Sequence, residues 1–128
     1  MKKEYTGDEI KVAIADDHVL FRTGVKTALS MKKDIHMIAE ADNGMQLLTL
    51  LKHVQPDVIL LDIQMPIMDG REATRQIRAS SAAYHDIPVL ALTASVMPDE
   101  QEAYMLLGVN GVITKPFSIN DLRDTVEY

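Results

Sequence analysis

Five side chains that can bind a metal ion or a phosphate each come at the end of a short apolar run, namely Asp16, Asp17, Asp62, Thr93 and Lys115. If these runs are parallel strands, their carboxyl ends share one edge of a sheet. Ligand sites form at that edge, beside the point where the strand order reverses. The edge would then gather carboxylates, a hydroxyl and an ammonium group, a combination typical of a site for a cation and for phosphoryl oxygens.

The carboxylates of Asp16, Asp17 and Asp62 need more positive charge than the sequence places beside them. Two like charges about 4 Å apart repel each other by about 4 kcal/mol at an effective dielectric constant of about 20. Lys115 contributes a single positive charge. Mg²⁺ would supply the rest, because it binds one or two carboxylates, keeps several water molecules and accepts phosphate oxygens. The sequence therefore predicts phosphate chemistry that depends on Mg²⁺.

The positions of these residues indicate separate roles. Asp16 and Asp17 are adjacent and fit a pair that holds the metal, whereas Asp62 stands alone and could attack phosphorus as a carboxylate nucleophile. Thr93 and Lys115 would then hold the phosphoryl oxygens, since phosphoryl transfer depends on alignment and on neutralisation of charge. The expected product is an aspartyl phosphate at Asp62.

The elements that must position these groups are short strands alternating with helices. Five runs are apolar throughout, at Val12–Ala15, Met37–Ala39, Val58–Leu61, Val89–Leu92 and Val112–Ile113. Continuous apolar runs are typical of strands covered on both faces. Segments with the spacing of an amphipathic helix lie between them, most clearly from Phe21 to Leu29 and from Leu47 to Val54. The alternation predicts an α/β domain, a doubly wound five-stranded parallel sheet with helices on both faces.

Local signals place the remaining helices and turns. Asn43 can cap the second helix, Pro98 suits the first position of the fourth, and Gly108 can end it. Asp69-Gly70 is expected to form a turn. The segment from Ala79 to Asp86 is expected to be a surface connection.

Two helices depend on weaker patterns. The segment from Glu72 to Arg78 places Ala73 and Ile77 on an inner side, and its arginines are expected to point outward: Arg71, Arg75 and Arg78. A last helix is expected near the end of the chain, where three apolar residues have helical spacing: Ile119, Leu122 and Val126.

Length and composition limit the classes of protein. With 128 residues, 47% of them hydrophobic, the chain fits one globular domain; we expect a flexible tail at residues 1–9 and the domain at residues 10–128. The formal net charge of −6 argues against nonspecific binding to nucleic acid. The absence of cysteine excludes disulfides, thiolate catalysis and zinc held by cysteine. No apolar run approaches the roughly 18 residues of a membrane span, so we expect a cytoplasmic protein without a membrane partner.

Four segments resemble the signatures of receiver domains of two-component response regulators: Ala15–His18, Leu60–Gly70, Ala91–Ala94 and Thr114–Phe117. They occur in the order and spacing of that family, and the resemblance extends from about Lys11 to the end of the chain. It implies the flavodoxin-like fold with strand order 2-1-3-4-5. It also implies a signalling domain that assists its own phosphorylation and dephosphorylation, not an enzyme.

The resemblance assigns a role to each site residue. Asp62 would be phosphorylated by a phosphohistidine on a sensor histidine kinase or a histidine phosphotransfer protein, with Thr93 and Lys115 assisting. Mg²⁺ would bind to Asp16, Asp17, Asp62 and the carbonyl of Gln64. The family also suggests a cis bond between Lys115 and Pro116.

The sequence departs from the family in ways that affect switching. Val112 stands where many members have the Tyr or Phe that couples to the hydroxyl of Thr93. At the two positions that tune the phosphoryl lifetime in the family, this chain has Gln64 and Ser95, which leave that lifetime open. The opening of the chain resembles regulators with a DNA-binding domain, whereas its later part resembles receivers of hybrid sensor kinases.

The output surface is expected around Tyr104, Val112 and the last helix, with a possible homodimer through the fourth helix, fifth strand and fifth helix.

Competing functions are disfavoured by particular residues. A phosphatase with an aspartyl-phosphate intermediate needs an acid two residues after the nucleophile, where this chain has Gln64. A nucleotide or flavin binder needs a loop rich in small residues after the first strand, but Asp16 and Asp17 would repel the phosphate. An inert receiver would have no need of all five site residues. His18 is expected on the surface or in packing rather than as a ligand.

Overall fold

A parallel sheet of five strands forms the centre of the computed structural model, which describes residues 9–95 and 97–115. The strands are β1 (Ile10–Ala15), β2 (Ile35–Ala41), β3 (Val58–Asp62), β4 (Val89–Thr93) and β5 (Gly111–Thr114). Their order across the sheet is β2-β1-β3-β4-β5, and all neighbouring pairs are parallel. The predicted doubly wound sheet and its strand order are confirmed.

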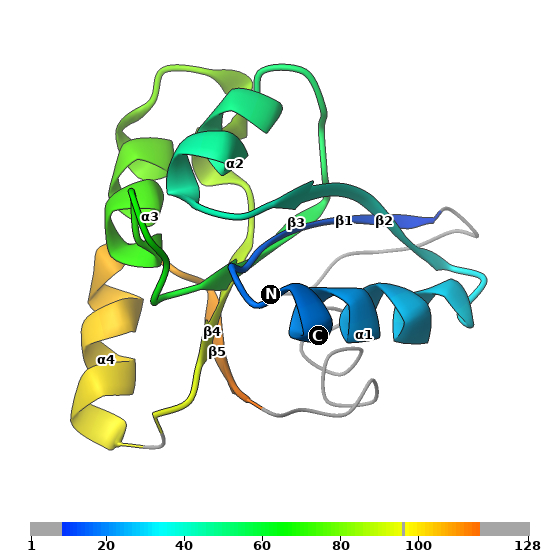
Figure 1. Cartoon of the computed structure of the whole chain (residues 1–128). Helices are drawn as coiled ribbons and strands as arrows, with labels where there is room; N and C mark the ends of the chain where they lie inside the picture. The colour runs from blue at the N-terminus through cyan, green and yellow to red at the C-terminus, as the bar shows by residue number, and fades with distance from the viewer. Residues whose placement is uncertain (1–8, 96, 116–128) are drawn as a thin grey trace.

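Helices cover both faces of this sheet (Figure 1). They are α1 (Val19–Ser30), α2 (Gly44–Leu50), α3 (Gly70–Ala79), α4 (Pro98–Leu107) and a short 3-10 helix, Ala83–Asp86. Val25 and Leu29 of α1 pack in the hydrophobic core on one face. Leu47 of α2, Ile77 of α3 and Tyr104 of α4 pack in the core on the other. The predicted last helix and the Lys115-Pro116 bond lie outside the described residues, as does nearly all of the predicted tail.

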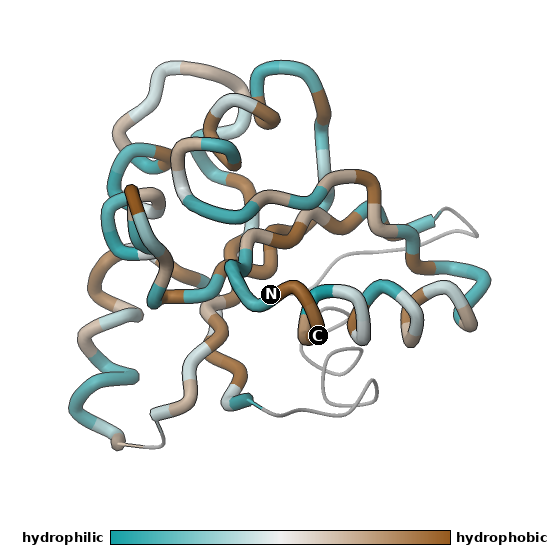
Figure 2. The backbone as a smooth tube through the Cα atoms, viewed as in Figure 1, coloured by the Kyte–Doolittle hydropathy of each residue, from teal (hydrophilic) through white to brown (hydrophobic). Residues whose placement is uncertain are grey.

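The continuous apolar runs of the sequence are explained by these two cores. In β3, Ile59 and Leu61 belong to the core under α2 and α3, whereas Val58 and Leu60 belong to the core under α1. Every residue of β3 and β4 is buried. Figure 2 shows the same hydrophobic runs along the strands in the middle of the molecule. None of the described helices is long and apolar enough to cross a membrane.

β2 is only partly covered, which the sequence analysis did not predict. This strand lies at the edge of the sheet and pairs with β1 on one side. Its burial alternates, with Ile35 and Ala39 buried and Glu40 exposed. Ile38, which was expected inside, is 37% exposed. An apolar run of a few residues does not distinguish a central strand from an edge strand.

Helix α3 begins where a turn was predicted. The side chain of Asp69 accepts a hydrogen bond from the backbone N–H of Glu72 at 2.9 Å and caps the helix, so Asp69-Gly70 is a helix start. A Cβ atom at Gly70 would lie 2.5 Å from the carbonyl oxygen of Asp62. Only glycine therefore allows α3 to start this close to the end of β3. The caps at Asn43, Pro98 and Gly108 are confirmed.

Arg78 of α3 does not point outward as predicted. Its guanidinium donates hydrogen bonds to the carbonyl oxygens of Gly108 at 2.9 Å and Ile87 at 2.7 Å, and to the side-chain oxygen of Asn110 at 2.8 Å. A further bond reaches the carbonyl of His85 at 3.0 Å. Burial lowers the pKa of Arg78 from its ordinary value. The side chain of Arg78 therefore joins the end of α4 to the segment before β4.

Replacing Arg78 with methionine should destabilise the domain. The Arg78→Met variant keeps much of the apolar stem but leaves several carbonyl oxygens without a donor, and we expect a loss of about 2–3 kcal/mol in the free energy of unfolding. Urea unfolding measures this loss. The matched control is Arg75→Met on the exposed side of the same helix, where the ion pair with Glu72 should contribute less than about 1 kcal/mol. Equal losses in the two variants would contradict the assignment.

Candidate functional site

The five predicted site residues lie at the carboxyl ends of four strands. Asp16 and Asp17 follow β1, Asp62 ends β3, Thr93 ends β4 and Lys115 follows β5. From β1 the chain continues to β2 on one side of β1, whereas β3, β4 and β5 lie on the other side of β1 in the sheet. The strand order therefore reverses between β1 and β3, which is the position where α/β sheets form ligand sites.

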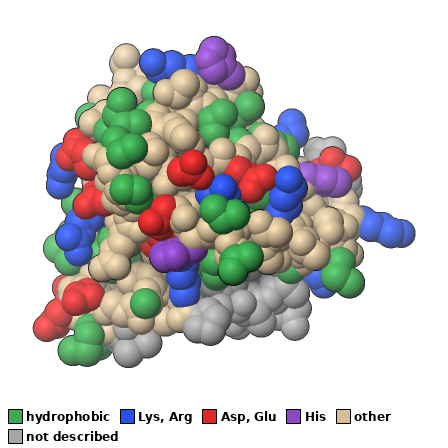
Figure 3. Space-filling view, viewed as in Figure 1, with side chains coloured by type: hydrophobic (Ala, Val, Ile, Leu, Met, Phe, Trp, Pro, Cys, Tyr) green, Lys and Arg blue, Asp and Glu red, His purple; other side chains and the backbone are tan. Residues whose placement is uncertain are grey.

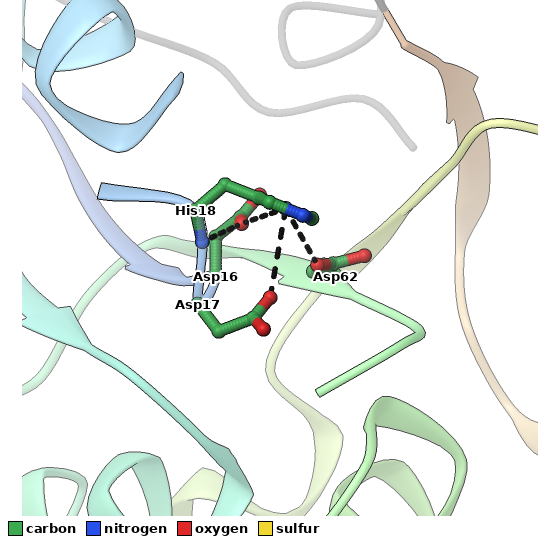
Figure 4. Close-up of side chains that lie close together, drawn as sticks. All are labelled: Asp16, Asp17, His18 and Asp62. Atoms are coloured by element: carbon green, nitrogen blue, oxygen red, sulfur yellow. Dashed lines mark hydrogen bonds and ion pairs between the residues drawn. The ribbon is translucent and has the colours of Figure 1, made fainter. Parts of the chain in front are cut away.

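The acidic residues converge on one small volume. Asp16, Asp17, His18 and Asp62 each offer a ligand atom, and these atoms all lie within 4.8 Å of one another. Figure 4 shows the four side chains pointing toward one another from the ends of β1 and β3. Asp16 is fully buried and the side chain of Asp62 is 6% exposed, whereas that of Asp17 is 34% exposed. The site is thus closed on its inner side and open at Asp17.

Lys115 lies against the two buried carboxylates. Its Nζ atom is 2.6 Å from Asp16 Oδ2 and 3.6 Å from Asp62 Oδ2, and its side chain is 15% exposed. Its backbone N–H donates to the carbonyl oxygen of Thr93 at 2.8 Å. The Thr93 hydroxyl accepts a hydrogen bond from the N–H of Ser95 at 3.0 Å. The two distances from Lys115 Nζ show that the ammonium pairs more closely with Asp16 than with Asp62.

His18 has a closer relation to the site than the sequence analysis expected. Its ring is exposed, as predicted, but Nδ1 lies 3.1 Å from Asp16 Oδ1, 3.5 Å from Asp17 Oδ1 and 3.8 Å from Asp62 Oδ2. Its backbone N–H also donates to Asp16 Oδ1 at 2.8 Å. The position of His18 directly after Asp16 and Asp17 was the one sequence feature that could have indicated its place in the site. Its spacing from the other histidines did not indicate a metal ligand. In the space-filling view, acidic and histidine side chains gather near the centre of this face (Figure 3).

Arg22 of α1 anchors the loop that carries Asp16 and Asp17. Its Nη1 atom donates to the carbonyl oxygen of Asp16 at 2.5 Å and to Asp42 Oδ1 at 2.8 Å, while Nε donates to Glu40 Oε1 at 3.2 Å. The side chain is only 13% exposed. The sequence pattern did not indicate this role, because two of the partners, Glu40 and Asp42, lie at the end of β2, far away along the chain.

Asp62 is held in an environment that disfavours its charge. Burial, and then the neighbouring charge of Asp16, raise the pKa of Asp62 from 3.8 to about 6, against the opposing effect of Lys115. Asp62 Oδ1 accepts a weak hydrogen bond from the N–H of Gln64 at 3.3 Å. Among the described residues, the buried Asp62 Oδ2 atom has no hydrogen-bond partner. An added cation would relieve this cost.

The raised pKa of Asp62 predicts a pH dependence of stability without divalent cations. Because its pKa is higher in the folded state, the folded state binds more protons between about pH 4 and 6. The stability contribution of this group is therefore fully present below about pH 3.8 and is lost as the pH rises through about 6, by on the order of 2–3 kcal/mol. Urea unfolding of wild type and Asp62→Asn across this range measures it. The free energy of unfolding of Asp62→Asn should increase relative to that of the wild type as the pH rises. Parallel stability profiles of the two proteins against pH would contradict the prediction.

Comparisons with known proteins agree with this arrangement. Residues 12–127 match the family model of the response regulator receiver domain. The chain is 35% identical over 129 residues to the transcriptional regulatory protein DegU of Brevibacillus brevis, in an alignment covering 99% of this chain and 52% of DegU. It is 37% identical over 119 residues to the response regulator protein VraR of Staphylococcus aureus, covering 91% and 54%. The chain thus spans about half the length of these curated relatives.

Solved structures share the same fold. The receiver domain of the sensor histidine kinase PA1611 from Pseudomonas aeruginosa PAO1 superposes with a TM-score of 0.81 at 25% identity, covering 93% of this chain and 95% of that one. That structure has a magnesium ion coordinated in its active site cleft. Family match, strand order and converging acids all indicate a phosphoacceptor module. The chain belongs to the response regulator receiver domain family.

Proposed function

We propose that Asp62 is the residue that accepts the phosphoryl group, from a phosphohistidine on a sensor histidine kinase or a histidine phosphotransfer protein. The observation that carries this proposal is the Asp62 Oδ2 atom, which is buried, without a hydrogen-bond partner among the described residues, and 3.6 Å from the ammonium of Lys115. Asp16 is engaged by Lys115 and His18. Asp62 is therefore the carboxylate that is least committed within the buried pair.

The transfer is a displacement at phosphorus. A carboxylate oxygen of Asp62 attacks the phosphorus atom, and the new P–O bond forms as the P–N bond of the phosphohistidine breaks. The electron pair of that bond returns to the imidazole nitrogen, which takes up a proton. Lys115 balances negative charge on the phosphoryl oxygens, and Thr93 donates its hydroxyl to one of them.

The residues present fit a magnesium ion. Three carboxylates have ligand atoms within 4.8 Å of one another, and the buried Asp62 Oδ2 atom accepts no hydrogen bond from the described residues; together they form the hard oxygen donor set that Mg²⁺ prefers. We assign the ion to Asp16, Asp17 and Asp62, with the backbone carbonyl of Gln64 as the remaining protein ligand. When bound, the ion neutralises charge shared between the carboxylates and the phosphoryl oxygens. Burial, and then the neighbouring charge of Asp16, raise the pKa of Asp62, and a bound cation would offset both effects.

We propose that phosphorylation shifts α4 and β5 by drawing Thr93 toward Asp62 and reshaping the loop that leads to Pro98. The predicted output surface needs one correction, because Tyr104 is buried, whereas Met105 and Leu106 of α4 are exposed. A homodimer would use α4, β5 and the segment that follows. The phosphohistidine donor makes the cytoplasm the expected compartment, and the net charge of −6 argues against direct binding of nucleic acid by this chain.

The test of the proposal is transfer from a labelled phosphohistidine donor to the purified chain. We expect label to move to this chain in the presence of Mg²⁺, and we expect a metal chelator to stop the transfer. Measurable turnover of phosphomonoesters without a stable adduct would favour the phosphatase alternative instead. Failure of several phosphohistidine donors and of acetyl phosphate to label the chain would contradict the proposed function.

A further inference from the structure

Lys115 has a third neighbour besides the two carboxylates. Its Nζ atom lies 4.3 Å from the centre of the Phe21 ring, over the face of the ring. The distances from Nζ to Asp16 Oδ2 and Asp62 Oδ2 are 2.6 and 3.6 Å. The ammonium is therefore enclosed by a buried acid, by the proposed phosphoacceptor and by an aromatic ring.

The Phe21 ring is fixed from the side of α1. Phe21 is partly buried and packs against the hydrophobic core between α1 and the sheet. The next residue, Arg22, joins the same turn of α1 to the carbonyl oxygen of Asp16 and to Asp42 at the end of β2. The ring is thus held in place by a helix turn that is itself anchored to the ends of two strands.

The closest partner of the ammonium is a residue that the proposed metal also needs. Asp16 Oδ2 pairs with Lys115, yet Asp16 belongs to the group whose ligand atoms converge within 4.8 Å. A carboxylate shared with a divalent cation attracts an ammonium less strongly, because the two positive charges repel each other. The face of an aromatic ring attracts an ammonium without carrying a net charge that would compete for the cation.

We propose that Phe21 is a positioning residue for phosphoryl transfer, because the face of its ring holds the Lys115 ammonium beside Asp62. The inference rests on the proposed function and adds a residue from outside the strand ends. Phe21 does not touch the phosphoryl group; it acts through Lys115. The ring also sets the direction from which the ammonium approaches, which the flexible four-carbon stem of lysine leaves open.

The test is a graded series of fluorinated phenylalanines at Phe21. Fluorine withdraws electron density from the ring face while changing the size of the ring little, so packing is preserved and the attraction for the ammonium falls. With acetyl phosphate and saturating Mg²⁺, we expect the phosphorylation rate to fall stepwise along the series, by roughly 3- to 30-fold in total. The melting temperature should stay nearly constant.

A second measurement needs no metal and no phosphodonor. Protons near the face of an aromatic ring show upfield NMR shifts, so the terminal methylene of Lys115 should be shifted upfield in the wild type and return toward ordinary values in Phe21→Leu. The matched control is the same fluorinated series at Tyr84, compared with Tyr84→Phe, because this aromatic ring is partly buried on the α2 and α3 side of the sheet. The fluorinated series at Tyr84 should leave the phosphorylation rate unchanged.

The outcomes separate this inference from the proposed function. A wild type that no phosphodonor labels would overturn the proposed function itself. A labelled wild type, with a flat rate along the Phe21 series and unchanged Lys115 shifts in Phe21→Leu, would overturn only the role of Phe21. A rate that falls in step with the melting temperature would show that Phe21 contributes through packing, which also contradicts the proposal.

Discussion

The Asp62→Asn variant should form no phosphoryl adduct with acetyl phosphate and Mg²⁺, under conditions in which the wild type is labelled. The amide that replaces the carboxylate is neutral and a poor nucleophile, so the attacking oxygen is lost. The variant should still fold, because the substitution removes a carboxylate whose charge is disfavoured by burial. Intact-protein mass spectrometry measures the adduct, and thermal unfolding shows that the variant is folded.

Asp69→Asn is the matched control for this loss. Asp69 lies in the loop after β3, and its side chain caps α3 through the N–H of Glu72. Asparagine is as good an N-cap as aspartate, so the control keeps the helix start while removing a nearby carboxylate. We expect it to be labelled like the wild type. An adduct that persists in Asp62→Asn would remove Asp62 from its assigned role.

Lys115→Met should slow phosphorylation by roughly 10²- to 10³-fold while Mg²⁺ binds at least as tightly as in the wild type. The rate falls because the ammonium that balances charge on the phosphoryl oxygens is lost. Mg²⁺ affinity should not fall, because an ammonium 2.6 Å from Asp16 Oδ2 competes with a divalent cation for that carboxylate. Stopped-flow kinetics and calorimetric titration with Mg²⁺ measure the two quantities separately.

The opposite directions of the two effects make the Lys115 prediction specific. A variant that merely misfolds would lose Mg²⁺ affinity along with the rate. Lys26→Met is the control, because Lys26 is an exposed lysine that pairs with Glu40 at 3.1 Å outside the acidic site. It should change neither quantity appreciably. A Lys115→Met variant with an unchanged rate, or with weakened Mg²⁺ binding, would contradict the role given to this ammonium.

The fold could be predicted from the sequence because its strands have an unusual composition. Buried parallel strands need apolar residues on both sides, and Val58–Leu61 satisfies this requirement without alternation. Strand ends were less predictable. β1 begins at Ile10, and β2 extends from Ile35 to Ala41, well beyond its apolar run. In both cases, pairing between neighbouring backbones extends the strand past the residues that the pattern identifies.

The strand ends also explain how much of the site was predictable. Asp16, Asp62 and Lys115 converge because parallel strands bring their carboxyl ends to one edge, whatever the sequence distance between them. Side chains that bind groups on a different helix or strand could not be identified from the sequence pattern. Arg22 binds the end of β2, and Arg78 binds the end of α4, through contacts that depend on helix placement.

A role that depends on the shape of one side chain was least predictable. Phe21 fitted the helical pattern of α1 as a core residue, and its packing in the core under α1 agrees with that reading. Its contact with Lys115 follows from the distance between the first turn of α1 and the end of β5, which periodicity does not encode. The same holds for the turn of the His18 ring toward the carboxylates.

The most direct test of the central claim is the position of the phosphoryl group on the chain. Borohydride reduces an aspartyl phosphate to homoserine, so reduction of the labelled protein followed by peptide mass spectrometry identifies the acceptor. We predict homoserine at position 62 in the Mg²⁺-treated wild type and none in a sample treated with chelator. Homoserine at position 16, 17 or 69, or label that borohydride does not convert, would contradict the account.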